Sequence, residues 1–246
     1  MPAQDTEAII LKTFPLGEAD RLVSFLSRSS GRMRGVAAGA RKLKNRYGST
    51  LELLAHVQME YIERETRDLV RIQQCDLLDS FHAAQSEYSL ATGLALVSEI
   101  VEILLPEREP AEAMFRLVLL TAREIERRKE WRIPAGYFVF WAVKLAGWLP
   151  PLDRCGKCGA QLGSGDGYHA SWSPGQLCRD CRHPGMRAIS LPAREVAPLF
   201  ARKGLEKLSE AEAPGGLVGE LRDACLDWIE HHTERKLITR NLLETA

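Results

Sequence analysis

The order of apolar and polar residues divides the chain into two parts with different periodicity. In the first part, short apolar runs occupy residues 7–12, 22–26, 32–37, 51–61 and 69–72, separated by glycine, proline or charged turns. Alternation with a period of two places successive side chains on opposite faces of a β-strand. We therefore expect five short strands within residues 1–80, the content of a small closed barrel.

From about Ser86 the apolar period changes to 3.6, the repeat of an α-helix. Helices are expected over residues 90–104 and 115–125, from Pro134, from about Pro192, and over residues 217–237. The helix that Pro134 opens is apolar on most faces, which predicts a central position. The pattern predicts an α+β protein with a β domain at residues 1–80 and a mainly α-helical domain at 81–246.

Two cysteine pairs interrupt the helical region. They are Cys155-x2-Cys158 and Cys178-x2-Cys181, with 19 residues between them. A two-residue gap lets a tight turn direct both thiolates at one metal ion, and a second turn completes a tetrahedron with Zn–S distances of about 2.3 Å. Four sulfurs leave no open coordination position. The spacing predicts one structural zinc ion in a knuckle at about residues 152–187.

Other roles for these cysteines stay open at this point. Two disulfides would need an oxidising compartment, and the polar N-terminal residues lack the apolar segment of a secretion signal, so a cytoplasmic location is expected. A redox pair would account for one cysteine pair only, and a knuckle could have lost its metal. His169 or His183 could replace one cysteine as a ligand. Cys75 and Cys225 lie in apolar patterns and are expected in the core.

Charge is balanced overall but unevenly distributed. The chain has 33 basic and 33 acidic residues, yet residues 21–51 contain no acidic residue and eight basic ones: Arg21, Arg28, Arg32, Arg34, Arg41, Lys42, Lys44 and Arg46. One interpretation is an ordinary solvated face, but such faces usually mix both signs. We favour binding to phosphate groups. A five-stranded oligonucleotide-binding barrel (OB-fold) is one natural candidate for this region, with mainly electrostatic binding because its aromatic residues are few.

The sequence offers no recognisable catalytic motif. It contains no Walker motif, no His-Glu-x-x-His and no nucleophile elbow, so we do not expect an enzyme. No apolar run reaches the roughly 20 residues that span a bilayer, and no membrane association is expected.

Several segments resemble the RecO family of bacterial recombination mediators and DNA repair proteins. The resemblance rests on residues 7–12, 17–21 and 31–42, on the stretch from Gly147 to Cys155, and on residues 231–240. Thr239 stands where the family is expected to have serine. The segments occur in the family's order along the whole chain.

The resemblance implies an N-terminal OB-type barrel, a helical domain and a zinc knuckle inserted in that domain. It also implies a non-catalytic protein of the cytoplasm and nucleoid that binds single- and double-stranded DNA and anneals complementary strands. With the ring-forming protein RecR, such a protein helps to load RecA onto DNA coated with single-strand-binding protein, so that RecA is an indirect partner.

The acidic, apolar-tipped tail of single-strand-binding protein needs a groove with a cation at its edge. Two basic clusters could supply the cation: Arg127 to Lys129, and the set formed by Arg235, Lys236 and Arg240. We favour the second cluster because the resemblance returns there. For either cluster, the alternative is a basic helix end that complements the helix dipole.

Two rival functions remain at this stage. An RNA-associated zinc protein, such as a ribosome or tRNA factor, would share the basic barrel and the knuckle. An enzyme with a site built from scattered residues would show no motif.

Overall fold

The computed structural model describes residues 3–63 and 68–243. Contacts divide the chain into two compact units, Met1–Glu126 and Arg127–Ala246, which we describe separately. The expected boundary at residue 80 lies where the last strand of the barrel ends, and it stays a prediction about domain organisation. Within the described residues, no helix is both long and apolar enough to cross a bilayer.

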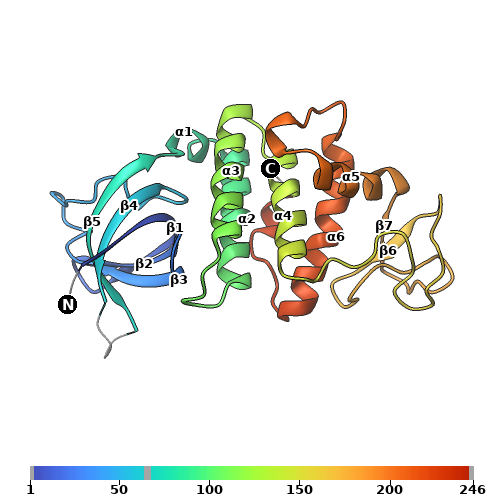
Figure 1. The fold of residues 1–246 in the computed structure, drawn as a ribbon, viewed down its shortest axis with the longest axis horizontal. Coiled ribbons are helices and arrows are strands. Elements are labelled where there is room, and N and C mark those ends of the chain that lie inside the picture. The colour runs from blue at the N-terminus through green and yellow to red at the C-terminus, as the bar shows by residue number, and fades with distance from the viewer. Residues whose placement is uncertain (1–2, 64–67, 244–246) are drawn as a thin grey trace. The chain divides into compact units, whose positions relative to one another are not determined.

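The first unit begins with a closed five-stranded barrel (Figure 1). Its strands are β1 (Gln4–Leu16), β2 (Asp20–Ser27), β3 (Gly31–Ala37), β4 (His56–Ile62) and β5 (Val70–Asp79). The order around the barrel is β1-β2-β3-β5-β4, and β1 closes it by pairing with β4. All neighbours are antiparallel except β3 and β5, which run parallel. This confirms the predicted OB-type barrel.

Alternation along the strands fills the barrel. Phe25, Met33, Met59 and Ile72 are among the buried residues that form its core. Along β3 the inward positions are buried while Arg32 and Arg34 lie outward, as the period of two predicted. The two arginines therefore share one outer face of the barrel.

Three helices complete the first unit: α1 (His82–Gln85), α2 (Tyr88–Leu104) and most of α3 (Glu112–Arg128). Helix α2 packs against β1, where Ser98 Oγ donates a 2.7 Å hydrogen bond to the Leu11 carbonyl oxygen. Gly31 has a positive φ of 73°, and a Cβ placed there would lie 1.7 Å from the Glu109 carbonyl oxygen. Only glycine allows the chain before α3 to approach the barrel this closely.

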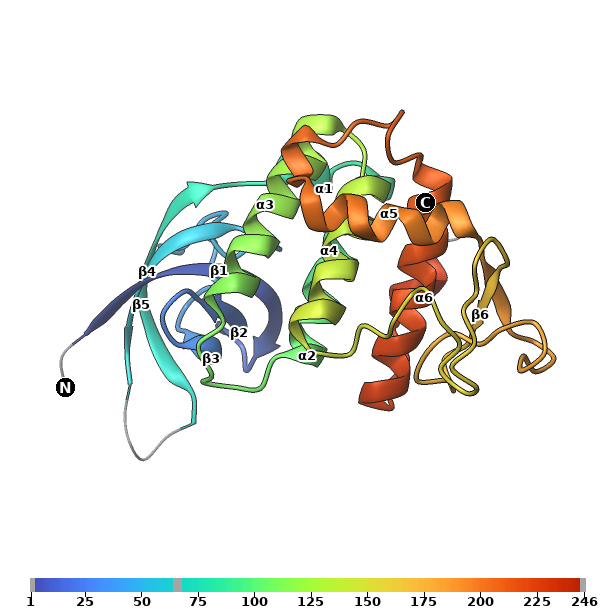
Figure 2. The same ribbon diagram turned by 45° about the vertical axis from the view of Figure 1, so that its right-hand side comes forward.

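The second unit is built on two long helices that lie side by side, α4 (Arg132–Leu145) and α6 (Gly215–Thr233) (Figure 2). Most residues of α4 are buried, as its apolar pattern predicted. Gly136 permits the close packing, because a Cβ at this position would lie 2.2 Å from Val218 Cγ1. Helix α5 (Leu191–Arg202) packs on α6, and a 3-10 turn (Leu205–Lys207) and helix α7 (Arg240–Leu243) complete the helical part.

The cysteine-containing segment lies between α4 and α5. It includes a two-stranded hairpin, β6 (Gly167–His169) and β7 (Arg187–Ile189), which the sequence pattern did not predict because each strand has only three residues. Strand β7 also contacts α6. The predicted overall class, a barrel followed by helices with an inserted cysteine knuckle, is confirmed.

Three element boundaries differ from the expectations. The strand expected over residues 51–61 begins only at His56, because residues 51–55 form turns in which Leu54 has a φ of 55°. Pro134 is not the first residue of α4, which begins at Arg132 after Trp131. Helix α6 ends at Thr233 rather than near residue 237, because Glu234 adopts the left-handed conformation that reverses the chain.

Candidate functional site

The four predicted cysteines converge in the second unit. The Sγ atoms of Cys155, Cys158, Cys178 and Cys181 all lie within 4.8 Å of one another. A tetrahedral site with metal–sulfur bonds of about 2.3 Å requires sulfur–sulfur separations of about 3.8 Å. The distance between Cys158 Sγ and Cys178 Sγ is 3.8 Å. The geometry and the donor type therefore fit one metal ion bound by four thiolates.

Tight turns hold the first cysteine pair in this position. The Gly159 amide donates to the Cys155 carbonyl oxygen at 2.9 Å, and Gly159 has the positive φ of 73° that this turn requires. The Lys157 amide approaches Cys155 Sγ at 3.4 Å. Burial alone raises the pKa of the Cys155 thiol, but hydrogen bonds from backbone amides outweigh burial and lower it to about 6. The site thus favours a thiolate, the form that binds metal.

The second cysteine pair is also placed so that a bound cation would stabilise it. Hydrogen bonds to the neighbouring cysteines raise the pKa of Cys181 to about 12. The pKa values of Cys155 and Cys181 move in opposite directions because the neighbouring thiols interact with one another. A bound divalent cation removes the conflict, because it stabilises all four as thiolates.

Neither histidine considered as a substitute ligand belongs to this cluster. Among the described residues, the four cysteines form the one group of side chains placed to hold a metal ion. His169 instead points its Nδ1 to Asp227, and the His183 ring lies 5.6 Å from that of Trp172.

Arg194 of α5 holds the knuckle loops in place, a role that no sequence motif indicates. Its buried guanidinium donates to the carbonyl oxygens of Leu152 at 2.9 Å and Gly163 at 3.1 Å, and also to that of Gly165. Burial lowers the pKa of Arg194. One charged side chain thereby satisfies three loop carbonyls that the short hairpin leaves unpaired.

The basic segment of the barrel divides into two groups. In the first group, Arg28, Arg32 and Arg34 form ion pairs within the first unit. Arg28 pairs with Glu7 at 2.8 Å and Glu112 at 3.2 Å; Arg32 pairs with Glu102 at 3.6 Å, and both Arg32 and Arg34 pair with Glu107. The absence of acids from residues 21–51 therefore does not leave these three arginines unneutralised.

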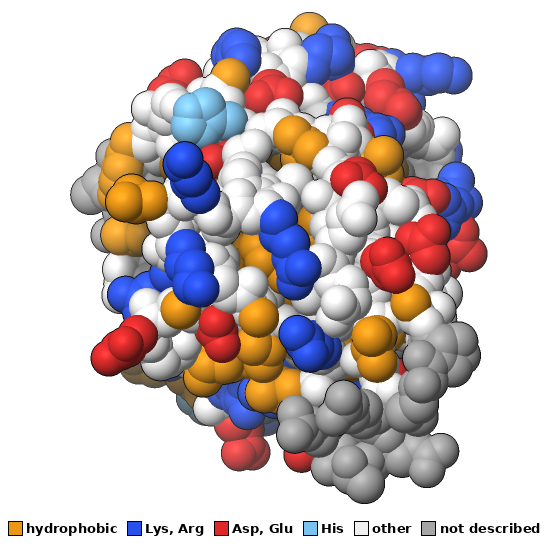
Figure 3. Space-filling model, turned by 90° about the vertical axis from the view of Figure 1, so that its left-hand side faces the viewer, with side chains coloured by type: hydrophobic (Ala, Val, Ile, Leu, Met, Phe, Trp, Pro, Cys, Tyr) orange, Lys and Arg blue, Asp and Glu red, His pale blue; other side chains and the backbone are white. Residues whose placement is uncertain are grey.

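The second group comprises Arg21, Arg41, Lys42, Lys44 and Arg46, all of them exposed. Within the described part of the chain, none of the five forms an ion pair; Arg21, Arg41 and Arg46 donate hydrogen bonds to neutral oxygen atoms. They lie at the β1–β2 hairpin and in the loop after β3. Figure 3 shows the molecule from the end at which the barrel lies, where basic side chains are spread over the centre of the face and several acidic ones gather toward its right edge.

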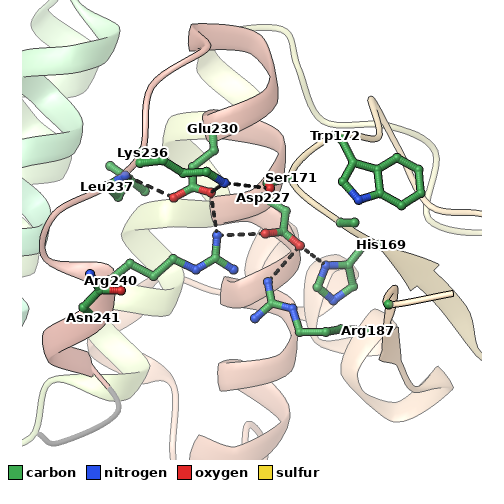
Figure 4. A pocket seen from close by; sticks show the side chains of 12 residues that line it. His169, Ser171, Trp172, Arg187, Asp227, Glu230, Lys236, Leu237, Arg240 and Asn241 are labelled. Carbon is green, nitrogen blue, oxygen red and sulfur yellow. Dashed lines mark hydrogen bonds and ion pairs between the residues drawn. The ribbon is translucent and has the colours of Figure 1, made fainter. Parts of the chain in front are cut away.

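Two residues of the C-terminal basic cluster, Lys236 and Arg240, line a pocket of about 480 Å³ in the second unit (Figure 4). Arg240 Nη1 lies 2.8 Å from Asp227 Oδ1 and 3.1 Å from Glu230 Oε2. Lys236 Nζ lies 2.9 Å from Glu230 Oε2 and donates to Ser171 Oγ at 2.8 Å. Arg235 is exposed and does not line the pocket. The structure thus brings Lys236 and Arg240 to the pocket, whereas Arg235, the residue just before Lys236, lies outside its lining.

Two buried carboxylates form the polar base of this pocket. The side chains of Asp227 and Glu230 are each 3% exposed. His169 Nδ1 lies 2.7 Å from Asp227 Oδ2, and Arg187 lies 2.8 Å from the same oxygen. Burial raises the pKa of Asp227, but these hydrogen bonds and the charge of Arg240 outweigh burial and lower it to about 2. With Lys236 added, three permanent cations face two carboxylates, so the pocket keeps a positive surplus.

Comparison with known proteins covers the whole chain. A family model described as Recombination protein O N terminal matches residues 1–81, and one described as Recombination protein O C terminal matches residues 85–241. The DNA repair protein RecO of Koribacter versatilis is 36% identical over 241 residues, which are 98% of each chain. That of Syntrophobacter fumaroxidans is 34% identical over 100% of this chain and 99% of its own. That of Frankia casuarinae is 31% identical over the full length of both.

Proposed function

Because the chain belongs to the RecO family of DNA repair proteins, we propose that it is a recombination mediator that binds DNA and makes or breaks no covalent bond. It binds single- and double-stranded DNA and anneals complementary strands in the cytoplasm, at the nucleoid. Together with RecR it helps to load RecA onto DNA coated with single-strand-binding protein.

The observation that carries this proposal is the group of five exposed cations without ion pairs on the barrel, Arg21, Arg41, Lys42, Lys44 and Arg46. Phosphate groups attract such side chains without regard to base sequence, and counterion release then favours binding. Arg28, Arg32 and Arg34 were part of the predicted DNA-binding set, but their carboxylate partners would have to be displaced or shared. We therefore assign the main phosphate contacts to the five.

Mobility-shift and annealing assays on the purified protein test the proposal. We expect binding to single- and double-stranded DNA and faster annealing of complementary strands. Stronger binding to structured RNA than to DNA, with no annealing, would instead favour an RNA-associated zinc protein.

We propose that the ion at the cysteine cluster is zinc and that it stabilises the knuckle. Four thiolates saturate a tetrahedral ion and leave no position for substrate or water, so the expected role is structural. The four cysteines, the 3.8 Å sulfur separation and the low pKa of Cys155 support this assignment.

We further propose that the pocket beside Lys236 and Arg240 receives the acidic tail of single-strand-binding protein. The pocket has surplus positive charge, and two apolar side chains lie close to it in the chain or in space: Trp172, which lines it and is 53% exposed, and Ile238, which is 74% exposed. A peptide with acidic residues and an apolar end complements both features. Arg235 would then lie at the rim of the peptide-binding site, where a charge affects the rate of association more than the affinity.

A further inference from the structure

The loop that joins β3 to β4 carries an apolar side chain, Leu43, that no described residue of the first unit covers. Leu43 is fully exposed, with a relative accessibility of 106%, whereas the other exposed large apolar side chains of the barrel, such as Leu78 and Phe14, reach 49% and 42%. Isolated exposed leucines are common on protein surfaces and carry no meaning alone. Three further observations distinguish Leu43.

The first observation is that the loop is held on the side that precedes Leu43. The Arg41 amide donates to the Ala19 carbonyl oxygen at 2.9 Å, and the Arg41 guanidinium donates to that of Gly17 at 2.6 Å. The Gly39 amide donates to Asp20 Oδ1 at 2.8 Å. These contacts fix the loop to the turn of the β1–β2 hairpin.

The second observation is that the loop is also held on the side that follows Leu43. Asn45 Oδ1 accepts hydrogen bonds from the Tyr47 and Gly48 amides, both at 2.9 Å, and Asn45 Nδ2 donates to the Lys42 carbonyl oxygen at 3.1 Å. Tyr47 is buried, and its hydroxyl donates to the Ile72 carbonyl oxygen at 3.0 Å. We call Lys42, Leu43 and Lys44 the tip of the loop. Because the loop is fixed on both sides of the tip, the tip can bind a ligand without a large loss of conformational entropy.

The third observation concerns charge. Lys42 and Lys44 flank Leu43 directly, both are exposed, and neither forms an ion pair with any described carboxylate. An apolar group set between two cations matches a ligand in which negative charges alternate with flat apolar surfaces. A nucleic-acid strand has this chemistry, with phosphates for the lysines and base faces for the leucine.

We propose that Leu43 inserts between neighbouring bases of a bound strand while Lys42 and Lys44 hold the phosphates on either side. The insertion unstacks the bases locally and exposes their pairing edges, so that a complementary strand can pair with them. This inference rests on the proposed DNA binding and adds to it the mode of contact. It also accounts for annealing by a barrel that exposes few aromatic side chains.

The test uses the full-length protein and single-stranded oligonucleotides that contain 2-aminopurine, whose fluorescence rises when the base is unstacked. Leu43→Ser is compared with wild type and with Leu78→Ser, which changes an exposed leucine of β5 by the same substitution. For Leu43→Ser we expect affinity within about threefold of wild type, because the lysines remain. We expect the fluorescence rise at saturation to fall by at least half and annealing to slow at least threefold. Leu78→Ser should match wild type in all three measurements.

The outcomes separate this inference from the proposed function. If wild type and Leu43→Ser bind DNA and give the same fluorescence rise, or if wild type binds without any rise, the insertion is wrong while DNA binding stands. If wild type binds no DNA, the proposed function itself fails. If Leu43→Ser leaves DNA unstacking intact but abolishes binding to vesicles of anionic lipid, the tip contacts a membrane surface instead. An unchanged melting temperature for Leu43→Ser excludes misfolding as the cause of any loss.

Discussion

Asp227 and Arg240 form an ion pair in which Arg240 Nη1 lies 2.8 Å from Asp227 Oδ1. Asp227 belongs to helix α6 and Arg240 to helix α7, so the pair closes the chain segment that turns back after Thr233. The Leu237 amide reinforces this turn by donating to Glu230 Oε1 at 3.0 Å. Buried carboxylates on α6 thus determine where the C-terminal residues lie within the second unit.

Replacing Asp227 should destabilise the protein in a pH-dependent way. Asp227→Asn removes the buried carboxylate of Arg187 and one of the two buried carboxylates that pair with Arg240, which is expected to cost about 3 kcal/mol of unfolding free energy at neutral pH. The folded-state pKa of about 2 lies below the ordinary 3.8, so this carboxylate stabilises the fold above about pH 4 and progressively loses that effect as the pH falls toward 2. The difference between wild type and variant should therefore shrink on acidification.

Urea unfolding at pH 7, 5 and 3 measures this difference. Asp223→Asn is the matched control, because Asp223 lies on the same helix and is about one-third exposed. Its unfolding free energy should stay within about 0.5 kcal/mol of wild type. Equal stability of Asp227→Asn and wild type at pH 7 would contradict the prediction.

Freshly purified protein should contain one zinc ion per chain. Chelation should mainly unfold residues 152–187, because the rest of the second unit has its own apolar core around α4 and α6. Structural zinc contributes on the order of 10–16 kcal/mol of apparent binding free energy in isolated fingers, enough to hold a segment with so little secondary structure. Elemental analysis and hydrogen exchange measure the two effects.

Cys178→Ser should lose the metal, whereas Cys75→Ser, a change of a buried barrel cysteine outside the cluster, should retain it. Much less than one zinc ion per chain in wild type, or iron in its place, would overturn the assignment.

Charge reversal should separate the two groups of basic residues on the barrel. We first assume that all five cations without ion pairs contact phosphates. A plot of the logarithm of the DNA association constant against the logarithm of the salt concentration should then have a slope of about −3.5 for single strands, at ~0.7 per contact. Lys42→Glu with Lys44→Glu should reduce the slope to about −2.1 and weaken binding to every sequence at least tenfold. Titrations at several salt concentrations give both values.

Arg28→Glu with Arg34→Glu provides the control of equal charge change. Its effect should be several-fold smaller, because carboxylates already neutralise these arginines. Equal losses for the two double variants would show that the ion pairs open when DNA binds.

A peptide with an acidic, apolar-tipped sequence should bind to the pocket of the second unit. Arg235→Glu with Lys236→Glu should weaken this binding at least fivefold, because the variant reverses the local charge. Calorimetric titration of wild type and variant measures the loss, and thermal unfolding of both checks that stability is unchanged.

Arg202→Glu with Lys207→Glu changes two exposed cations of the second unit outside both basic clusters and should bind the peptide as wild type does. Equal affinity of the Arg235/Lys236 variant at unchanged stability would remove this cluster from the docking site. Loss of peptide binding with DNA binding intact would support it.

Sequence reasoning succeeded where the signal was local. Strand β3 and helix α4 followed from periodicity, and the four cysteines followed from spacing that tight turns impose. The boundary of β4 was missed because Leu51 and Leu54 are buried by a turn rather than by a strand, and an apolar run does not distinguish the two.

Ion pairs between residues far apart in the sequence could not be predicted in this way. The carboxylates that pair with Arg28, Arg32 and Arg34 include Glu107 and Glu112, which lie 73 to 84 residues away along the chain. A run of basic residues without acids therefore overstated the free positive charge. The end of α6 was also missed. The left-handed conformation of Glu234 turns the chain back so that Arg240 reaches Asp227 and Glu230, and the local apolar pattern does not indicate these contacts.

The three hydrogen bonds from Arg194 to the knuckle loops have a kinetic consequence. They come from helix α5 and do not involve the cysteines, so Arg194 offers the carbonyl oxygens of Leu152, Gly163 and Gly165 a donor that does not depend on the ion. When the knuckle unfolds on loss of the ion, Arg194 stays on α5 as an attachment point from which the loops can refold around a new ion. Metal loss and recovery would be a reversible local event in the life of the protein, repeated without refolding the helices around it.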